Sequence, residues 1–321
     1  MSWVCPMCST SNLDSDEKCI VCDTKNPSGT LPFDLQQQIV NVMAQMKGII
    51  AKRNLMDEEA LKSEHELGLL AFRKGNYSEA YSHFIKAAEC EYAPSENEVG
   101  DCYYYGHGVS KDYKEAFKWF LRAAEHGNAQ AQYNVGYCYT RAQGVDKNYS
   151  QAVTWFRKAS DQGHAAAQNE LADLYYYGNG VIQNYATAFL LFMESANAGD
   201  VRAMYNVAFC YSKGQGTEKD LRKAFSFYKK AADLGHLSSI NAVGDCYYYG
   251  NGIEKDQVKA VEYFKIAAEK GLAAAQYNIG FCFEHGYGIL HSKRSAISWY
   301  SKAASQGHEG AQKALEKLNE G

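Results

Sequence analysis

Four cysteines near the N-terminus are the residues of this chain whose types and spacing are best suited to chemistry. They form two pairs, Cys5 with Cys8 and Cys19 with Cys22, and two residues separate the members of each pair. Two such pairs place four thiolates tetrahedrally around one metal ion, an arrangement that suits zinc or iron. Because protein ligands would fill all four positions, the sequence predicts one structural Zn²⁺. Residues 1–30 are too short to build their own core, so we expect this finger to fold only with metal bound.

The other six cysteines predict structural roles. Five of them lie at multiples of 36 residues from one another, namely Cys102, Cys138, Cys210, Cys246 and Cys282. A disulfide framework is typical of small secreted chains, and neighbouring repeats would not bring these thiols into disulfide geometry. We therefore expect small buried core residues in a reducing compartment.

Composition narrows the class of protein. The chain has 321 residues, of which 46% are apolar, and a formal net charge of -4. These values argue against a disordered or coiled-coil chain, and the acidic balance disfavours nucleic acid as a partner. No run of about 18 apolar residues predicts a membrane span, and the N-terminus lacks the pattern of a secretory signal. The expected location is therefore the cytoplasm or the nucleus.

An internal repeat of 36 residues predicts the architecture that must position any functional residue. Three positions recur in six copies without an insertion: a turn glycine, a second glycine and an alanine between them. The three series are Gly108, Gly144, Gly180, Gly216, Gly252 and Gly288; Gly127, Gly163, Gly199, Gly235, Gly271 and Gly307; and Ala116, Ala152, Ala188, Ala224, Ala260 and Ala296. A fixed period of this length indicates a solenoid rather than two or three separate globules.

Each copy has the pattern of a helical hairpin. In the second copy, Ala131, Val135 and Tyr139 share one face of a first helix, and the neighbouring Gly136 permits close helix approach. After the turn, the apolar stripe of a second helix consists of Ala152, Trp155, Phe156 and Ala159. Gly163 then suits a left-handed C-terminal cap. Such a hairpin buries its stripe only by stacking on its neighbours.

The repeat resembles the Sel-one-like repeat family, which is related to the tetratricopeptide repeats. The resemblance rests on Ala-Gln-Tyr-Asn-Val-Gly-Tyr-Cys-Tyr from Ala131, on Trp155-Phe156 and on Gln162-Gly163. It implies an all-α, right-handed α/α solenoid whose first helices line the concave surface. The predicted domains are a zinc finger at 1–30, an amphipathic helix and linker at 31–56, a tetratricopeptide-like hairpin at 57–94, six Sel-one-like repeats at 95–310 and a capping helix at 311–321. The helix at 31–56 is expected to pack on the first hairpin, or else to bind a partner or pair with a second copy of itself.

The finger also resembles a known family, the Ran-binding-protein type of zinc finger. Trp3, Asn12 and the two cysteine pairs carry the resemblance. The family contains ubiquitin binders and single-stranded RNA binders. Ser9-Thr10 stands where the ubiquitin binders have Thr-Phe, and residues 13–18 lack the arginines of the RNA binders. A protein contact or a structural cap is therefore favoured, and a single-stranded RNA factor is the alternative function.

No arrangement of residues predicts an enzyme. The Gly-x-Gly turns follow helices rather than strands and lack the third glycine of a dinucleotide-binding loop. His164, His236 and His308 recur after the capping glycine and are expected on the loop surface. An array of repeats also provides no single deep pocket.

A second period of 72 residues distinguishes odd from even copies. Odd copies carry an amide, a carboxylate and a tyrosine on the first helix, in the sets Asn97, Asp101 and Tyr104; Asn169, Asp173 and Tyr176; and Asn241, Asp245 and Tyr248. Even copies carry aromatic residues at the first two of these positions, namely Tyr133 and Tyr137, Tyr205 and Phe209, and Tyr277 and Phe281. The alternation arises either from duplication of an ancestral pair or from a peptide-binding groove.

These observations lead to the hypothesis of a non-enzymatic adaptor. Amides would hydrogen-bond a ligand backbone, aromatic rings would hold its side chains, and solvent-facing aspartates would favour a basic protein or peptide. The zinc finger would provide a second protein contact. The sequence indicates no oligomeric state.

Overall fold

The computed structural model describes residues 2–4, 11–13, 37–38, 40–42 and 57–320. Two short strands, β1 (Ser2–Val4) and β2 (Ser11–Leu13), pair antiparallel with Trp3 opposite Asn12. Residues 37–38 and 40–42 are helical. The four cysteines of the expected zinc finger and most of the expected amphipathic helix lie outside the described residues.

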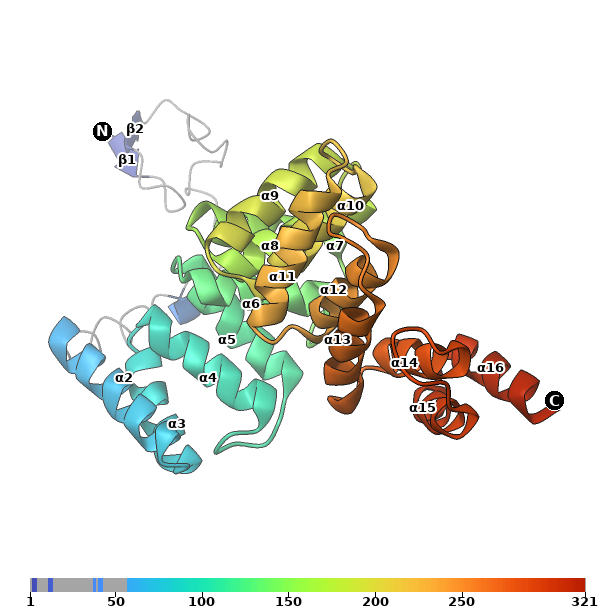
Figure 1. The fold of residues 1–321 in the computed structure, drawn as a ribbon. Coiled ribbons are helices and arrows are strands. Elements are labelled where there is room, and N and C mark those ends of the chain that lie inside the picture. Colours follow the sequence, from blue (N-terminus) through green and yellow to red (C-terminus); the bar gives the residue numbers. More distant parts are fainter. Residues whose placement is uncertain (1, 5–10, 14–36, 39, 43–56, 321) are drawn as a thin grey trace.

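From residue 57 onward the described chain is a continuous series of helical hairpins (Figure 1). The first helices of the hairpins are α2 (Glu58–Arg73), α4 (Ala93–Tyr105), α6 (Ala129–Arg141), α8 (Ala165–Tyr177), α10 (Val201–Lys213), α12 (Leu237–Tyr249) and α14 (Ala273–His285). The second helices are α3 (Tyr77–Ala88), α5 (Tyr113–Glu125), α7 (Tyr149–Asp161), α9 (Tyr185–Asn197), α11 (Leu221–Asp233), α13 (Gln257–Glu269) and α15 (Lys293–Ser305). A last helix, α16 (Glu309–Glu320), ends the array. The expected helical-repeat solenoid is confirmed.

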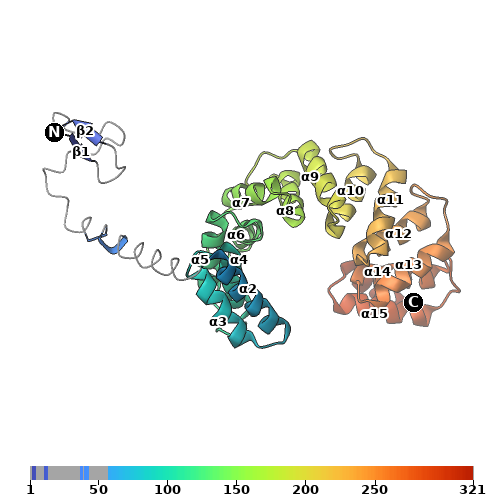
Figure 2. The same cartoon turned by 90° about the vertical axis from the view of Figure 1, so that its left-hand side faces the viewer.

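The hairpins stack into an array that curves as an arch in one view (Figure 2), while its first and last hairpins lie at opposite sides of the molecule in the view at right angles (Figure 1). The first helices, with even numbers, lie on the concave side of the arch, and the second helices, with odd numbers, lie on the convex side. We call the even-numbered set the inner helices and the odd-numbered set the outer helices. This arrangement puts one face of every repeat on a common concave surface.

Local sequence sets where the helices begin and end. The outer helix α5 begins at Asp112, whose carboxylate accepts a hydrogen bond of 2.8 Å from the Lys114 backbone N–H. Asn148 caps α7 in the same way through the Gln151 N–H. Side chains of this kind satisfy N–H groups that a helix N-terminus leaves unpaired. The inner helices from α4 to α14 end at a residue in the left-handed conformation, such as Gly106 with φ of 81°.

The core of each hairpin is an aromatic ring packed against a residue without a bulky side chain. Phe156 of α7 is fully buried and lies against Gly136 of α6, where an added Cβ would come within 2.7 Å of the ring. The contact recurs in other hairpins, for example between Phe120 and Gly100. The close helix approach expected at Gly136 is therefore confirmed, and it holds the inner helix firmly against its outer partner.

Consecutive hairpins join through the glycine of the turn between inner and outer helix. Gly144 has φ of 75°, and a Cβ there would lie 1.9 Å from the carbonyl oxygen of Tyr113, the first residue of α5. The same contact recurs between Gly180 and Tyr149. The turn of one repeat thus rests on the backbone of the preceding outer helix, which explains why the 36-residue spacing tolerates no side chain at this position.

Candidate functional site

The structure places every predicted partner-binding residue on the inner helices α4 to α14, along the concave side of the arch (Figure 2). Odd and even copies therefore alternate along one surface, as the sequence predicts. The side chains of the two kinds of copy do not form separate rows, however. They meet in pairs, because the inner helix of each odd copy packs beside that of the following even copy.

The asparagines form cross-links between neighbouring inner helices. The Asn134 amide donates a hydrogen bond of 3.0 Å to the Asn97 side-chain oxygen, and Asn206 donates to Asn169 over the same distance. Asn97 and Asn169 are only 4% and 2% exposed. The expectation that these two amides contact a ligand backbone is wrong, because burial and an internal partner already occupy them.

The third cross-link includes a carboxylate. The Asn278 amide donates to Asn241 at 3.0 Å and to Asp245 at 3.3 Å, and the Asn241 amide also donates to Asp245. Asn241 is only partly buried, and it lines a separate cavity of about 350 Å³ together with Phe209. Of the three predicted asparagines, Asn241 is thus the one that reaches a cavity.

The three predicted aspartates are half-buried rather than facing solvent, and this corrects the sequence-based expectation. Burial is the largest cause that raises the pKa of Asp101 and Asp173 to about 7. Burial also raises the pKa of Asp245 to about 6. Each aspartate follows a tightly packed inner-helix position, so neighbouring side chains cover part of its carboxyl group. These groups therefore change charge near neutral pH.

The aromatic residues of the even copies pack against histidines that the sequence analysis assigned to loop surface. His164 stacks on Tyr133 with ring centroids 5.1 Å apart, and its Nδ1 accepts a hydrogen bond from the Ala167 N–H. His308 stacks on Tyr277 at 4.7 Å. His164 and His308 therefore cap α8 and α16, and each fixes the tyrosine of the preceding inner helix. The third histidine, His236, lies edge-on to Tyr205 at 5.3 Å but does not cap its helix through its side chain. Their recurrence at 72-residue intervals, in step with Tyr133 and Tyr277, was the signal for this role.

Three equivalent pockets open on the concave surface, one for each pair of odd and even copies. Six residues characterise each of them, and we call them the pair pockets. The first contains Asp101, Tyr104, Tyr105, Tyr133, Asn134 and Tyr137. The second contains Asp173, Tyr176, Tyr177, Tyr205, Asn206 and Phe209. The third contains Asp245, Tyr248, Tyr249, Tyr277, Asn278 and Phe281.

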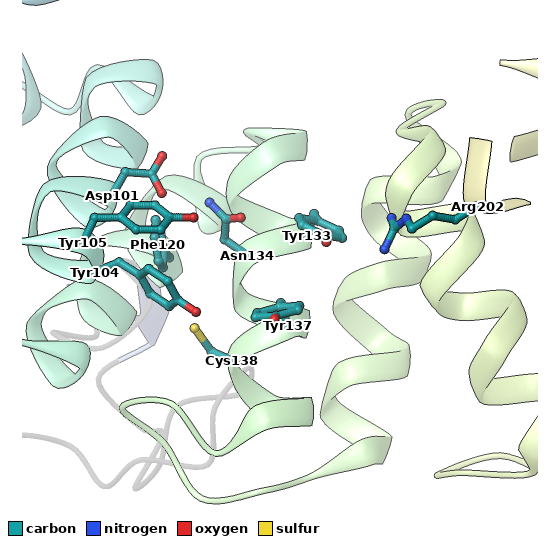
Figure 3. A pocket seen from close by; sticks show the side chains of 9 residues that line it. All are labelled: Asp101, Tyr104, Tyr105, Phe120, Tyr133, Asn134, Tyr137, Cys138 and Arg202. Atoms are coloured by element: carbon teal, nitrogen blue, oxygen red, sulfur yellow. The ribbon is translucent and has the colours of Figure 1, made fainter. Parts of the chain in front are cut away.

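The first pair pocket shows how the two helices share the site (Figure 3). Asp101 and Tyr105 come from α4 and lie opposite Asn134, while Tyr133 and Tyr137 from α6 form the other wall. The Tyr104 hydroxyl donates a hydrogen bond of 2.6 Å to the Gln143 side-chain oxygen, which fixes that ring. The pocket thus has aromatic walls and one carboxyl group.

Arg202 of α10 stands at the far side of the first pair pocket, beyond Tyr133 (Figure 3). Its guanidinium pairs with Glu170 at 2.9 Å and with Asp200 at 3.3 Å. The second and third pair pockets include no basic residue among their lining side chains. The sequence analysis missed Arg202, because its reach across two helices has no signature in the repeat.

Each pocket also has an exposed tyrosine at its rim that does not belong to the predicted partner-binding set. Tyr105, Tyr177 and Tyr249 end their helices and are 60%, 65% and 67% exposed. The asparagines of the even copies also line the pair pockets. These tyrosines and asparagines recur every 72 residues, as the aspartates do, so the same sequence period could have indicated them.

The predicted metal site lies outside the described residues. Within the described ranges, no group of three or more His, Cys, Asp and Glu residues is placed to hold a metal ion. Cys102, Cys138, Cys210, Cys246 and Cys282 are free and buried, as expected, and burial raises the pKa of each thiol to about 12. These thiols are therefore unreactive core residues. None of the helices in the described part of the chain is long and apolar enough to cross a bilayer.

Comparison with protein families gives a match over most of the chain. The sequence model of the Sel1 repeat matches seven consecutive segments, at residues 63–92, 93–128, 129–164, 165–200, 201–236, 237–272 and 273–308. The first of these is the hairpin that the sequence analysis assigned to a tetratricopeptide-like type, so the number of Sel1 repeats is seven rather than six.

Two solved structures are similar to this one in sequence and in fold. A protective antigen of uropathogenic Escherichia coli with an SLR fold is 31% identical, with a TM-score of 0.71 over 85% of this chain and 58% of that chain. This chain thus spans little more than half the length of that relative. A Sel1 repeat protein from Oxalobacter formigenes is 30% identical, with a TM-score of 0.71 over 75% of this chain and 96% of that chain. A comparison with curated proteins finds no significant match.

Proposed function

The chain belongs to the Sel1 repeat family, and from this premise we propose that it is a non-enzymatic scaffold that binds protein segments along its concave surface. Proteins built from Sel1 and related helical repeats are generally non-catalytic scaffolds. A solenoid of this kind presents an extended surface formed by many equivalent elements. Such a surface suits a long, extended partner better than a small molecule.

The observation that carries this proposal is the recurrence of one pocket in three pairs of repeats. Each pair pocket opens on the same side of the arch and has an aspartate, an asparagine and aromatic rings at corresponding positions. A catalytic centre requires one constellation of groups at one place, whereas a binding surface gains affinity from each additional equivalent contact. The threefold recurrence therefore favours binding of a segment that passes all three pockets.

A photo-crosslinking experiment tests which face binds. A photoreactive phenylalanine analogue replaces Tyr177 on the concave side, and in a second variant it replaces Leu190 of the outer helix α9. The two positions are 65% and 62% exposed, so they are matched in accessibility. We expect cross-links to proteins in a cell lysate from position 177 that are missing from position 190. Equal cross-linking from both positions would contradict a concave binding surface.

We further propose that Cys5, Cys8, Cys19 and Cys22 hold one structural Zn²⁺ and that the finger makes a second protein contact. The spacing of the two cysteine pairs supports this proposal. Metal analysis of the purified chain is expected to give one zinc per molecule, and a Cys5→Ser and Cys19→Ser double variant should lose it. Equal zinc contents in the two proteins would overturn the assignment.

A further inference from the structure

The three pair pockets repeat one constellation of side chains. Their volumes are about 290, 170 and 110 Å³ in the order of the chain, so each is large enough for one side chain. One side of the wall packs on the core of the repeat, as the Tyr133 ring does at 5.8 Å from the Phe156 ring. The exposed rim ring, such as Tyr105, and the carboxyl group are not members of the core clusters and can contact a ligand.

The chemistry of a pair pocket fits a positively charged group. Tyr105 and its equivalents place an exposed ring at the rim, and Tyr133 and Tyr137 place two more rings along the wall. Ring faces attract cations, and the attraction is strongest where solvent is partly excluded. The Asp101 carboxyl adds a charge partner, and Asn97 holds it in place by donating to one of its oxygens at 3.2 Å.

Each pocket holds an acidic group beside its rings. Glu98 and Glu170 precede Asp101 and Asp173 by one helical turn, and each raises the pKa of its aspartate by repulsion. Arg202, which lines the first pocket, is already paired with two carboxylates.

The rings of the pockets already attract cations of this chain. The side chains of Arg141, Lys213 and Lys255 lie 5.5, 5.7 and 5.9 Å from the ring centres of Tyr137, Phe209 and Tyr248. An incoming cation would compete with these side chains for the rings, and it would gain the aspartate as a charge partner.

From this geometry, and resting on the concave scaffold proposed above, we propose that each pair pocket binds one lysine or arginine side chain of a single basic protein segment. The three pockets then act as three linked contacts, so that their affinities multiply along one chain. The occupant is a basic segment rather than an acidic or apolar one because each pocket supplies a carboxyl group and ring faces.

The repeat geometry also predicts the spacing of the basic residues. Packed helices lie about 10 Å apart, so inner helices two repeats apart are separated by about 20 Å. An extended chain advances about 3.3 Å per residue, so about six residues cover that distance. The preferred partner therefore has a basic residue at about every sixth position.

Binding of a cation should also depend on pH. A cation stabilises the charged form of an aspartate, so it binds more tightly once that aspartate has lost its proton. The groups that face the aspartates from the packed elements are Glu98, Cys102, Tyr105 and Cys138 at Asp101; Glu170, Asp200, Arg202 and Cys210 at Asp173; and Tyr205, Tyr228, Cys246 and Cys282 at Asp245. The cysteines and tyrosines stay neutral at pH 5.5 to 8. Burial also raises the pKa of Glu98, and loss of its proton strengthens cation binding in the same direction as loss of the aspartate protons. A neutral ligand that accepts a hydrogen bond from a protonated aspartate would show the opposite trend.

The test uses fluorescent peptides with three lysines in a glycine–serine background. One peptide has lysines about six residues apart, a second has the three lysines adjacent, and a third has glutamine in place of the spaced lysines. Fluorescence anisotropy gives the dissociation constants for the full chain between pH 5.5 and 8. We expect the spaced lysine peptide to bind at least tenfold more tightly than either other peptide, and its affinity to rise with pH.

Two sets of variants connect that affinity to the pockets. Replacement of Asp101, Asp173 and Asp245 by Asn should reduce the affinity for the spaced lysine peptide to that of the glutamine peptide. A control with Asp146→Asn, Asp161→Asn and Glu254→Gln removes the same charge from exposed positions outside the pockets and should change affinity less than twofold. If the Asn variant unfolds by circular dichroism, Tyr105, Tyr177 and Tyr249, which lie at the exposed rim, are changed to Ala instead.

Several results would overturn the proposal. Equal affinity for the spaced lysine peptide and the glutamine peptide would rule out a basic ligand. Equal affinity for the spaced and adjacent lysine peptides would rule out the binding of one side chain in each pocket. An affinity that falls with rising pH indicates a neutral ligand. In each case, cross-links from position 177 would still support the concave binding surface. The absence of those cross-links would contradict the proposed scaffold function.

Discussion

A single buried carboxylate links the inner and outer helices of the second repeat matched by the family. The Glu96 side chain is fully buried, and its two oxygens lie 2.7 Å from Arg122 Nε and 2.7 Å from His126 Nδ1. Two other repeats make the corresponding contact with neutral amides, through Gln162 with Gln132 and through Gln306 with Gln276, each at 2.8 Å. The same position of the repeat is thus occupied by charged partners in one repeat and by neutral partners in two others.

This substitution pattern gives a prediction about stability. Glu96→Ala should lower the free energy of unfolding by about 3 kcal/mol, because it leaves Arg122 and His126 without their partner. A Glu96→Gln and His126→Gln double variant, which copies the amide pair, should cost about 1 kcal/mol or less. Urea unfolding followed by circular dichroism measures both values. An equal loss of unfolding free energy in the two variants would show that this contact requires the charged side chains.

The half-buried aspartates give a prediction about pH. Their folded-state pKa values of about 7 for Asp101 and Asp173 and about 6 for Asp245 lie above the ordinary value of 3.8. A group whose pKa is raised by folding binds its proton more tightly in the native state. The stability from this source is complete below about pH 4 and is lost as the pH rises to about 7.

The comparison is between the wild type and the variant with Asn at all three positions. The Asn variant should have the higher melting temperature at pH 8, by about 2–4 °C for each kcal/mol of relieved repulsion and desolvation. The difference should shrink as the pH is lowered towards 5. Thermal unfolding at several pH values measures it. A constant difference across that range would mean that the carboxyl groups do not titrate with folding.

The residue scale is also where the sequence predicted least. The 72-residue alternation indicated Asp101 and Tyr133 correctly as concave positions, but not that Asn97 is buried by its neighbour. Nor did it show that His164 stacks on a tyrosine of the preceding inner helix. Both facts depend on side chains that are 31 to 37 residues apart. A residue's own type and its helical face do not determine such contacts.

At the scale of the element, two kinds of glycine with similar backbone angles have different roles. Gly144 and Gly163 have φ of 75° and 80°. A Cβ at Gly144 would lie 1.9 Å from a backbone carbonyl oxygen, whereas a Cβ at Gly163 would have no atom within 4 Å. Gly144 is therefore needed for both conformation and space, and Gly163 for conformation alone.

The two substitutions separate these requirements. Gly163→Ala should cost about 1 kcal/mol, the price of a left-handed conformation for a residue with a Cβ. Gly144→Ala should cost roughly 3 kcal/mol, because the backbone of α5 must also move away. Chemical denaturation of the two variants provides the comparison. Equal losses of unfolding free energy would mean that the α5 backbone moves at little cost, and that this contact does not fix the spacing between hairpins.

Elements were the part of the fold that the sequence predicted best. Recurring Gly and Ala at 36-residue intervals, with apolar stripes of helical period, located both helices of each hairpin. The tetratricopeptide-like assignment of residues 57–94 was less accurate. That hairpin lacks the turn glycine pattern of the later copies, although the Phe84 ring packs on Gly68 as in the other repeats. The shared core contact agrees with the match of the family model to residues 63–92.

At the scale of the whole molecule, the C-terminal helix closes the array. Ala311 of α16 is fully buried, and Leu315 and Leu318 pack on the cluster that includes Tyr300 and Ala303. A stacked array needs such a cap, because its last hairpin otherwise exposes an apolar face.

Ending the chain after His308 should therefore loosen the array from one end. We expect at least tenfold faster hydrogen exchange in α14 and α15, with little change in α4 to α8, because each repeat contacts mainly its neighbours. Hydrogen exchange with mass spectrometry resolves the gradient. Uniformly faster exchange along the chain would indicate a single cooperative unit instead. An α16 variant that replaces Lys313, which is exposed, with Ala is a control for surface effects.

The identical joints between repeats give the arch an elastic character. Each joint is a turn glycine seated on the preceding outer helix, and no longer linker interrupts the described series. Bending therefore has no preferred hinge, and a rotation of about 2° at each of six joints would add up to more than about 10° across the arch. The molecule would then respond to a partner as a coil spring does. It would widen or tighten along its whole length, and the three pair pockets would move apart or together by equal steps.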